Sequence, residues 1–184
     1  MKRSFFKKRA TACVLTALMV AVSIPLGVHC TQTRAAEQVT ALFYEGTNGD
    51  GYGIQYDLEQ RLGTAANLLT VAQRYLEAND PDLQALSTAR ENLSRAVDIR
   101  DKYDANVQLS DAAATMISRL KNEALSETDS QYVTQFETDL AAAQDRIARS
   151  SYNQEAQAYN NSLDDFPVSW LRGIAGVEEL ELFL

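Results

Sequence analysis

Residues that break helices are rare between residue 54 and the C-terminus at residue 184. The stretch contains two prolines and three glycines, namely Pro81, Pro167, Gly63, Gly173 and Gly176. Ala, Leu, Gln, Glu and Arg, which favour helices, are common in it. Because so sparse a set of breaks is typical of long helices, the sequence predicts an all-α fold, an antiparallel bundle of three to four long helices.

Apolar residues spaced by three or four place these helices. The first is predicted from about residue 54 to residue 78. The second begins near Pro81, whose missing N–H has no helical partner in a first turn, and it either breaks within residues 104–110 or continues with a kink. The last begins at the capping residue Ser126 and runs to about Asp165. Five residues after Pro81 are expected to face inward: Leu83, Leu86, Leu93, Val97 and Tyr103.

A Tyr-Asn pair occurs twice in the last helix, seven residues apart. The pairs are Tyr152-Asn153 and Tyr159-Asn160, and Phe166-Pro167 falls on the same step. The sevenfold spacing, typical of coiled coils, keeps the three aromatic residues on one stripe. Their rings bury large apolar areas, while a hydroxyl and a flanking amide can bond to another helix. We interpret the stripe as a buried seam rather than an exposed binding surface.

Two further features concern the end of the chain. The apolar step from Ile147 to Tyr152 is five residues, which rotates the stripe, so the two halves of the last helix are expected to face different neighbours. After Pro167 the chain is apolar and carries Trp170 and Phe183. This tail is expected to dock on the bundle or on a partner.

The N-terminus joins a basic start to an uncharged apolar segment. Residues 1–9 carry five positive charges, and residues 10–30 contain no Asp, Glu, Lys or Arg. As a helix, residues 10–30 would be ~31 Å long, which matches the hydrocarbon thickness of a bilayer. The most apolar part, residues 12–24, has the length of a signal-peptide core. The bundle is thus predicted to follow an N-terminal transmembrane or signal segment.

Processing of this segment has several possible outcomes. It is retained as an anchor, cleaved after Ala35 or near Cys30, or lipidated at Cys30. In each case the positive charges keep the N-terminus in the cytoplasm and place the body outside. The predicted location is the cell membrane, single-pass with an extracytoplasmic body, and the protein is secreted if the segment is cleaved.

The chain is expected to have three parts. Residues 1–30 form the anchor or signal, and residues 10–30 contact the membrane. Residues 31–53 form a flexible tether, because four glycines fall between residues 46 and 53. Residues 54–184 form the helical bundle.

The body is strongly acidic. Residues 37–184 hold 11 basic and 25 acidic residues, a net charge of −14. Nucleic-acid phosphates and anionic lipid head groups would repel such a surface. The sequence therefore argues against a nucleic-acid partner.

The body also lacks the usual catalytic side chains. The only histidine and both cysteines, His29, Cys13 and Cys30, lie in the apolar segment, so neither Ser-His-Asp or Cys-His catalysis nor a thiolate or imidazole zinc site can form in the body. The adjacent carboxylates Asp164-Asp165 and Glu178-Glu179 remain, and two carboxylates suffice to hydrolyse glycosides. Neighbours in sequence point to different sides of a helix, so we predict no catalytic residue, no cofactor and no metal.

The glycine-rich segment partly resembles a calcium loop. Asn48, Asp50, Gly51 and Asp57 give it a partial match to an EF-hand. With Gly51 at the sixth position, however, Gly46 would be the first ligand and Asp57 would replace the bidentate Glu at the twelfth. A flexible loop is the preferred interpretation.

These residues together resemble the LemA family. The resemblance rests on the basic start, the apolar segment and the stretch "ARSSYNQEAQAYNNSLDDFP". It rests also on Arg61, the pair Asn67-Leu68 and Tyr75 in the first helix of the body. The resemblance covers about residues 54–184. It implies a membrane-anchored antiparallel helical bundle of unestablished biochemical activity.

The function expected from the sequence is non-enzymatic. An exported long-helix body without catalytic side chains suggests a protein-interaction or scaffold module of the cell envelope, which engages another envelope protein through a helical face or the apolar tail. The alternatives are a cell-wall glycan hydrolase that uses carboxylates alone and a secreted calcium-responsive module.

Overall fold

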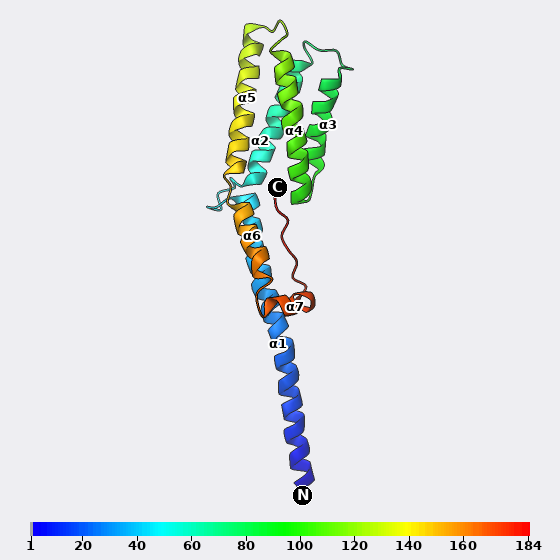
Figure 1. Ribbon diagram of the computed structural model, residues 1–184, viewed down its shortest axis with the longest axis vertical. Coiled ribbons are helices and arrows are strands. Elements are labelled where there is room, and N and C mark those ends of the chain that lie inside the picture. The colour runs from blue at the N-terminus through cyan, green and yellow to red at the C-terminus, as the bar shows by residue number, and fades with distance from the viewer. Residues whose placement is uncertain (1) are drawn as a thin grey trace. The chain divides into compact units, whose positions relative to one another are not determined.

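The computed structural model describes residues 2–184, with side chains from residue 9 onward, and this part of the chain is helical without a strand (Figure 1). Its helices are α1 (Lys2–Glu45), α2 (Ile54–Ala72), α3 (Pro81–Arg95), α4 (Ile99–Leu120), α5 (Glu127–Ala148), α6 (Tyr152–Ser162) and α7 (Val168–Ala175). The predicted all-α bundle with an N-terminal apolar helix is confirmed.

The chain divides into two compact units. Met1–Val39 and Gln157–Leu180 form one, here called the N-terminal unit. Thr40–Ala156 and Glu181–Leu184 form the other, here called the bundle unit.

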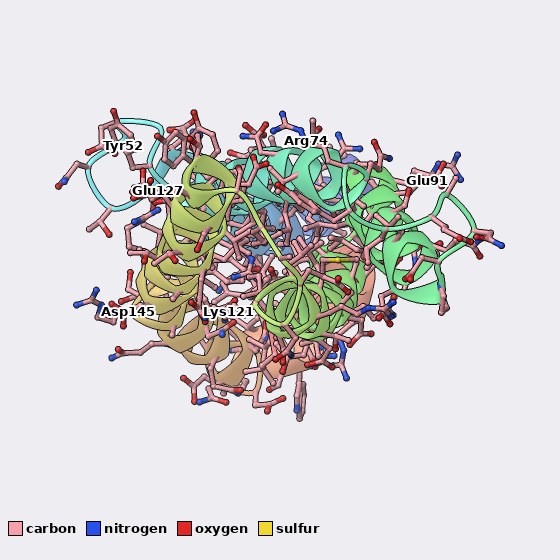
Figure 2. The ribbon with its side chains drawn as sticks, turned by 90° about the horizontal axis from the view of Figure 1, so that it is seen from above. Tyr52, Arg74, Glu91, Lys121, Glu127 and Asp145 are labelled. Carbon is pink, nitrogen blue, oxygen red and sulfur yellow. The ribbon has the colours of Figure 1, made fainter. Side chains whose placement is uncertain are left out.

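Helices α2 to α5 build the bundle unit. They run side by side in Figure 1, where α3 packs on α4 and α2 packs on α5 and α3. Apolar side chains spaced by three or four fill the interior, including the almost fully buried Leu58, Leu68, Leu86, Leu109, Met116 and Leu120. Seen end-on, the labelled charged side chains lie on the outside of the helices (Figure 2). Burial of this apolar stripe is the main stabilising force.

Two helix starts agree with the prediction. Asp80 accepts a hydrogen bond from the N–H of Asp82 at 2.9 Å, and Pro81 occupies the first turn of α3. Ser126 accepts one from the N–H of Asp129 at 3.1 Å and caps α5. Both side chains satisfy backbone donors that have no helical partner.

The end of α2 and the break between α3 and α4 differ from the prediction. α2 ends at Ala72 rather than residue 78. The break between α3 and α4 lies at residues 96–98 and not within residues 104–110, through which α4 continues. Ala96 is extended there, and Val97, predicted to face inward, is 77 % exposed. The reversal of direction at this turn points Val97 outward, an effect that a helical spacing rule cannot anticipate.

The predicted helix from residue 126 to residue 165 is divided into α5 and α6. α5 ends at Ala148, and α6 begins at Tyr152, whose N–H donates to the Ser150 hydroxyl at 3.3 Å. The apolar step of five therefore marks a break in the helix rather than a rotated stripe on a continuous one.

The aromatic stripe is only partly the seam that was predicted. Tyr152 is fully buried and Tyr159 is 6 % exposed, as expected, but Phe166 is 79 % exposed. α6 ends at Ser162, so Phe166 has left the helix that would have kept it on the stripe. It precedes Pro167 through a cis peptide bond.

The flexible tether expected over residues 31–53 is mostly helical, because α1 continues to Glu45. Phe43 is fully buried in the bundle unit, with ring contacts to Tyr152 and Phe183, and this packing favours a helix up to the turn. The turn itself needs glycine. A Cβ on Gly46, which has a φ of +75°, would lie 2.8 Å from a backbone oxygen, and one on Gly53 would lie 2.3 Å from another.

α1 is also the helix that could cross a membrane. Among residues 2–184, Arg9–Glu45 is the one segment long and apolar enough to do so, and none of its most apolar stretch is buried by the rest of the chain. Such a helix is able to act as an anchor; a signal sequence would have the same properties.

The N-terminal unit has its own small core. Tyr159, Leu163, Ala175 and Val177 are buried together, and partly buried residues of α1, α7 and the tail pack on them: Val28, Ala35, Ala36, Val39, Val168 and Leu180. His29 of α1 also lies with its Nδ1 2.7 Å from the carbonyl oxygen of Ala175 in α7. This unit therefore holds α7 against the segment of α1 that follows the apolar stretch.

Candidate functional site

Among the hollows of the bundle unit, a groove between α4 and α5 has a buried cation in its lining. Its volume is about 440 Å³, within the usual range for ligand pockets. Its walls are small or apolar, with Ala113, Ala114 and Ile117 from α4 and Leu140 and Ala141 from α5. Arg61 of α2 lines the same groove.

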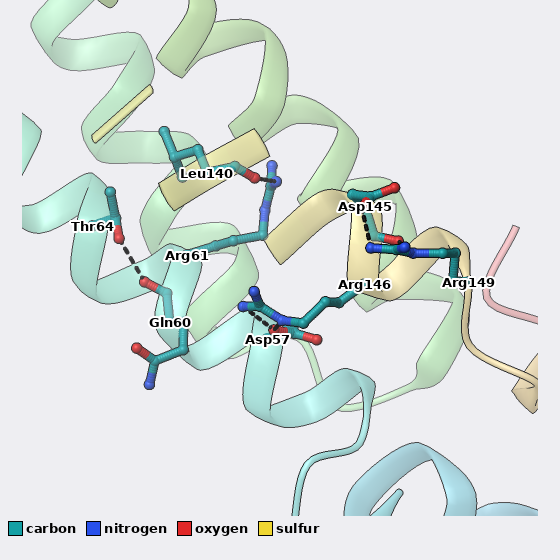
Figure 3. A network of polar contacts seen from close by, with 8 residues as sticks. All are labelled: Asp57, Gln60, Arg61, Thr64, Leu140, Asp145, Arg146 and Arg149. Atoms are coloured by element: carbon teal, nitrogen blue, oxygen red, sulfur yellow. Dashed lines mark hydrogen bonds and ion pairs between the residues drawn. The ribbon is translucent and has the colours of Figure 1, made fainter. Parts of the chain in front are cut away.

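Arg61 is a buried cation with an incomplete set of partners. Its residue is 3 % exposed, and in Figure 3 its side chain extends from α2 toward α5. Nη1 donates to the Leu140 carbonyl at 2.9 Å, and Nη2 donates to the Ser110 hydroxyl at 2.5 Å. Nε has no partner, and no carboxylate in the described part of the chain lies within 4.0 Å of the guanidinium. The positive charge is therefore not neutralised by direct contact.

The buried carboxylate nearest to Arg61 in sequence has another partner. Asp57, one helical turn before Arg61, is 5 % exposed and pairs with Arg146 of α5 at 2.6 Å (Figure 3). Burial lowers the pKa of Arg61 to about 10, and the attraction of Asp57 opposes that shift. The guanidinium remains protonated at neutral pH.

Two polar contacts between α2 and α5 fix the position of Arg61 along the helix pair. At one end of the antiparallel α2 and α5 pair, Asp57 binds Arg146. At the other, Asp129 accepts from Arg74 Nη1 at 2.7 Å and from the Tyr75 hydroxyl at 2.6 Å. The hydrogen bond from Tyr75 is the main reason that the pKa of Asp129 lies below its ordinary value. Because both ends are tied, the register between the helices keeps Arg61 beside Leu140.

A second buried polar group lies next to the groove. Asn106 is 1 % exposed, and its Nδ2 donates to Gln144 Oε1 at 3.1 Å. Its Oδ1 has no partner. Buried polar atoms without partners are uncommon in folded proteins and call for an explanation.

The rim of the groove carries an opposite pair of charges. Lys121 Nζ lies 2.6 Å from Glu137 Oε2, and both side chains are about half exposed. Exposed pairs of this kind contribute ~0–1 kcal/mol, so Lys121 can exchange Glu137 for another carboxylate at little cost. The groove thus combines apolar walls with a buried cation and an exchangeable cation at its edge.

The sequence predicted no site residue, yet it contains a signal for Arg61. Leu58, Arg61, Ala65 and Leu68 follow a spacing of three or four and are all buried. A charged residue on the apolar stripe of a helix is unusual, because burial of an unpaired charge is costly. The depth of the groove, by contrast, depends on the distance between α4 and α5, which no local pattern reveals.

The structure brings Asn48 and Asp50 of the calcium-loop residues together, but Asp57 has a different partner. Asp50 accepts from the N–H of Tyr52 at 3.2 Å and from Asn48 Nδ2 at 3.5 Å. Asp57 points to Arg146 instead of to the loop. Within the described residues, no group of three or more His, Cys, Asp or Glu side chains is placed to hold a metal.

The adjacent carboxylates do not form a catalytic pair either. Arg172 lies between one member of each, 3.6 Å from Asp164 and 3.1 Å from Glu179. Both carboxylates are largely exposed. This is a solvated ion-pair cluster in the N-terminal unit, and none of the described grooves is lined by it.

Comparison with known proteins supports the resemblance seen in the sequence. The sequence model of the LemA family matches residues 52–184, which is more than half of the chain. A search of the curated proteins found no match. The matched region contains the Tyr-Asn repeat and Arg61, so the chain belongs to the LemA family.

Proposed function

We propose that this protein is a membrane-anchored interaction module of the cell envelope, whose extracytoplasmic bundle binds a carboxylate-bearing segment of another envelope protein in the groove over Arg61. The LemA family is not a known enzyme family. α1 supplies the anchor, and the bundle unit supplies the groove.

The observation that carries this proposal is the unneutralised charge of Arg61. Removal of a charge from water costs several kcal/mol unless an opposite charge and hydrogen bonds compensate. Here a carbonyl and a hydroxyl compensate in part, and Nε is left without a partner. A residue that breaks a rule of stability without a local benefit points to a functional role. A ligand carboxylate would supply the missing charge.

The surroundings of the groove favour a protein segment as the ligand. Its walls of alanine and isoleucine suit an aliphatic side chain, while Arg61 and Lys121, which line the same groove, suit an acidic group. The rest of the body is strongly acidic and would repel an acidic partner at any other point. Repulsion elsewhere and attraction here together provide specificity.

The orientation can be tested with one cysteine. In a variant that carries Cys13→Ala and Cys30→Ala, Gln131→Cys puts a single thiol on an exposed position of α5. We expect a membrane-impermeant maleimide to label it in cells whose cytoplasmic membrane is intact, as the positive N-terminus requires. A cytosolic protein with one cysteine is the control for membrane integrity. Labelling only after lysis would contradict the extracytoplasmic placement.

The groove can be tested with two neighbouring alanines. Ala141 lines the groove and Ala142 does not, although both are exposed on α5. A photo-crosslinking residue placed at Ala141 in the full-length chain should yield a discrete adduct in cells, and one placed at Ala142 should not. Mapping of the adduct should find Asp, Glu or a chain terminus in the partner's crosslinked segment.

Arg61→Leu, combined with the crosslinking residue at Ala141, tests whether binding depends on the charge of Arg61. The adduct at Ala141 should disappear, while the free energy of unfolding should not fall by more than ~1 kcal/mol, because removal of a buried charge without a direct partner also removes its desolvation cost. Equal adducts with and without Arg61 would exclude the groove as the carboxylate site.

A further inference from the structure

α7 and the residue Phe166 in the turn before it expose an apolar face that the rest of the N-terminal unit leaves uncovered. Phe166, Trp170 and Ile174 are 79 %, 82 % and 76 % exposed and follow one another at intervals of four residues. The first two rings are in edge-to-face contact with their centroids 6.2 Å apart. Single exposed apolar residues are ordinary on protein surfaces, but a continuous face of three large ones marks an interaction site.

The opposite face of α7 is apolar too. Ala175 is buried, and Val168 packs on the core that α7 shares with α1. The helix has one charged residue, Arg172, whose charge Asp164 and Glu179 balance. The polar sector of α7 is confined to Ser169, Arg172 and Gly173. The apolar faces of a helix are normally covered by protein or by lipid. Because protein covers only one face, the other requires a second apolar environment.

The position of α7 along α1 identifies that environment. Both belong to the N-terminal unit, and Figure 1 shows α7 beside α1. Residues 10–30 match the hydrocarbon thickness, and the contact between His29 and Ala175 lies one residue before the end of that stretch. One helical residue rises ~1.5 Å. The end of α7 that carries Ala175 therefore lies at the boundary between the hydrocarbon core and the head groups.

We propose that α7 lies in the interface of the same bilayer that α1 crosses, with Phe166, Trp170 and Ile174 directed into the boundary between head groups and acyl chains. This inference rests on the membrane anchoring given under the proposed function. Trp and other aromatic residues concentrate at this depth because their rings are apolar and Trp also has a polar N–H. The acidic residues beside α7 disfavour anionic head groups, so the lipid surface that fits is zwitterionic.

Trp170 is the only tryptophan of the chain, which makes the proposal directly measurable. The full-length protein is reconstituted into phosphatidylcholine vesicles, and its fluorescence is compared with that of the protein in vesicles whose acyl chains are brominated. We expect an emission maximum at short wavelength, loss of most of the fluorescence to bromine, and little quenching by aqueous acrylamide. These results would place the indole ring below the head groups.

Variants test whether the apolar face itself, rather than a general change in the protein, produces these fluorescence signals. Phe166→Ser with Ile174→Ser should reduce the quenching by brominated lipid and increase that by acrylamide, because the two apolar neighbours of Trp170 are lost. Val97→Ser removes an equally exposed apolar residue from the bundle unit and should change neither signal. Far-ultraviolet circular dichroism checks that each variant retains its helices.

Every other outcome contradicts the placement of α7, the membrane anchoring or both. Protein that floats with the vesicles but shows no quenching by bromine retains the anchor and overturns the placement of α7. Protein that does not float overturns both. Protection of Trp170 from acrylamide without quenching by bromine, growing with protein concentration, would mean that a second copy covers the face, and it also overturns the proposal.

Discussion

The two Tyr-Asn pairs form the same hydrogen bonds in two different units. In the bundle unit, the Tyr152 hydroxyl donates to the carbonyl of Glu181 at 2.6 Å. Asn153 then pairs with the backbone of Phe183, as its Nδ2 donates to the carbonyl at 2.8 Å and its Oδ1 accepts from the N–H at 2.8 Å. An Asn side chain presents the same donor and acceptor as a peptide group, and it therefore pairs with an extended chain as a neighbouring strand would.

The second pair repeats this pattern in the N-terminal unit. The Tyr159 hydroxyl donates to the carbonyl of Glu178 at 3.4 Å. Asn160 pairs with the backbone of Leu180. Its Nδ2 donates to the Leu180 carbonyl at 2.9 Å, and its Oδ1 accepts from the Leu180 N–H at 2.7 Å. The prediction that the amides bond to another helix was therefore wrong, since their partner is the backbone of the C-terminal tail.

The spacing of the repeat has a simple physical basis. Seven residues of α-helix rise ~10.5 Å, and three residues of extended chain cover ~10 Å. Pairs seven apart in α6 can therefore take equivalent partners three apart in the tail, such as Leu180 and Phe183.

The surroundings of the two tyrosines differ more than their hydrogen bonds do. Tyr152 is fully buried, and its ring centroid is 5.3 Å from that of Phe43. Burial raises the pKa of Tyr152 to about 12. Tyr159 lies among aliphatic residues, and burial raises its pKa as well. The repeat thus specifies which groups bond, while the neighbours determine how much each contact stabilises.

The largest contrast is expected from removal of the rings. Tyr152→Ala should lower the free energy of unfolding by ~3–5 kcal/mol, because it leaves a cavity in a closed aromatic cluster. Tyr159→Ala should cost about half as much, since its unit is smaller and more open. Urea unfolding followed by circular dichroism measures both. Equal losses would show that the two sites are energetically equivalent.

The amide pairs should contribute more equally. Asn153→Asp and Asn160→Asp each replace the Nδ2 donor by a carboxylate oxygen that faces a carbonyl, at a cost of ~1–3 kcal/mol. Amide hydrogen exchange at Phe183 and Leu180 should accelerate in the corresponding variant. Asn161→Asp, at the exposed neighbouring position, is the control and should leave both amides unchanged. Unchanged exchange in Asn153→Asp would mean that this amide does not hold the tail.

Loss of the tyrosine hydroxyl should lower the free energy of unfolding by different amounts at the two sites. Tyr152→Phe removes a hydrogen bond of 2.6 Å and should cost ~1 kcal/mol, whereas Tyr159→Phe removes one of 3.4 Å and should cost a few tenths. The urea midpoints of the two variants give the comparison. The reverse order would imply that the longer contact is the stronger one in solution.

The smallest effect is expected from alkaline pH. The pKa of Tyr152 is raised from 10.0 to about 12 in the folded state, so the folded protein binds more protons in this window. Its contribution is complete below pH 10 and is lost as pH rises toward 12. At pH 10.5 the difference in unfolding free energy between the wild type and Tyr152→Phe should shrink by ~0.8 kcal/mol. An unchanged difference would contradict the shifted pKa.

How far sequence reasoning succeeded depended on the range of each interaction. Pro81 and Ser126 reveal the starts of α3 and α5, because both act on the first turn of their own helix. The exposure of Phe166 could not be predicted from its sevenfold spacing, since a spacing rule holds only while the helix continues. The helix over residues 31–45 was missed for a related reason, because Phe43 is buried by residues distant in sequence.

The candidate site shows the same division. Arg61 could have been noticed as a charge on an apolar stripe, which is a local pattern. The groove above it could not, because its walls come from α4 and α5 and its floor comes from α2. The pairing of Asp57 with Arg146 leaves Arg61 without a counter-ion, and this choice between two arginines depends on the register of two antiparallel helices.

By itself, the sequence determined that the chain is helical, that its body is acidic and that this body lacks imidazole and thiol groups, since these properties follow from composition and from spacings within one turn. Only the tertiary structure decided that the Tyr-Asn pairs bind the C-terminal tail, that Arg61 is buried without a carboxylate, and that Phe166 and Trp170 are exposed. Each of these depends on which distant segments meet, and packing of the whole chain rather than any local preference makes that choice.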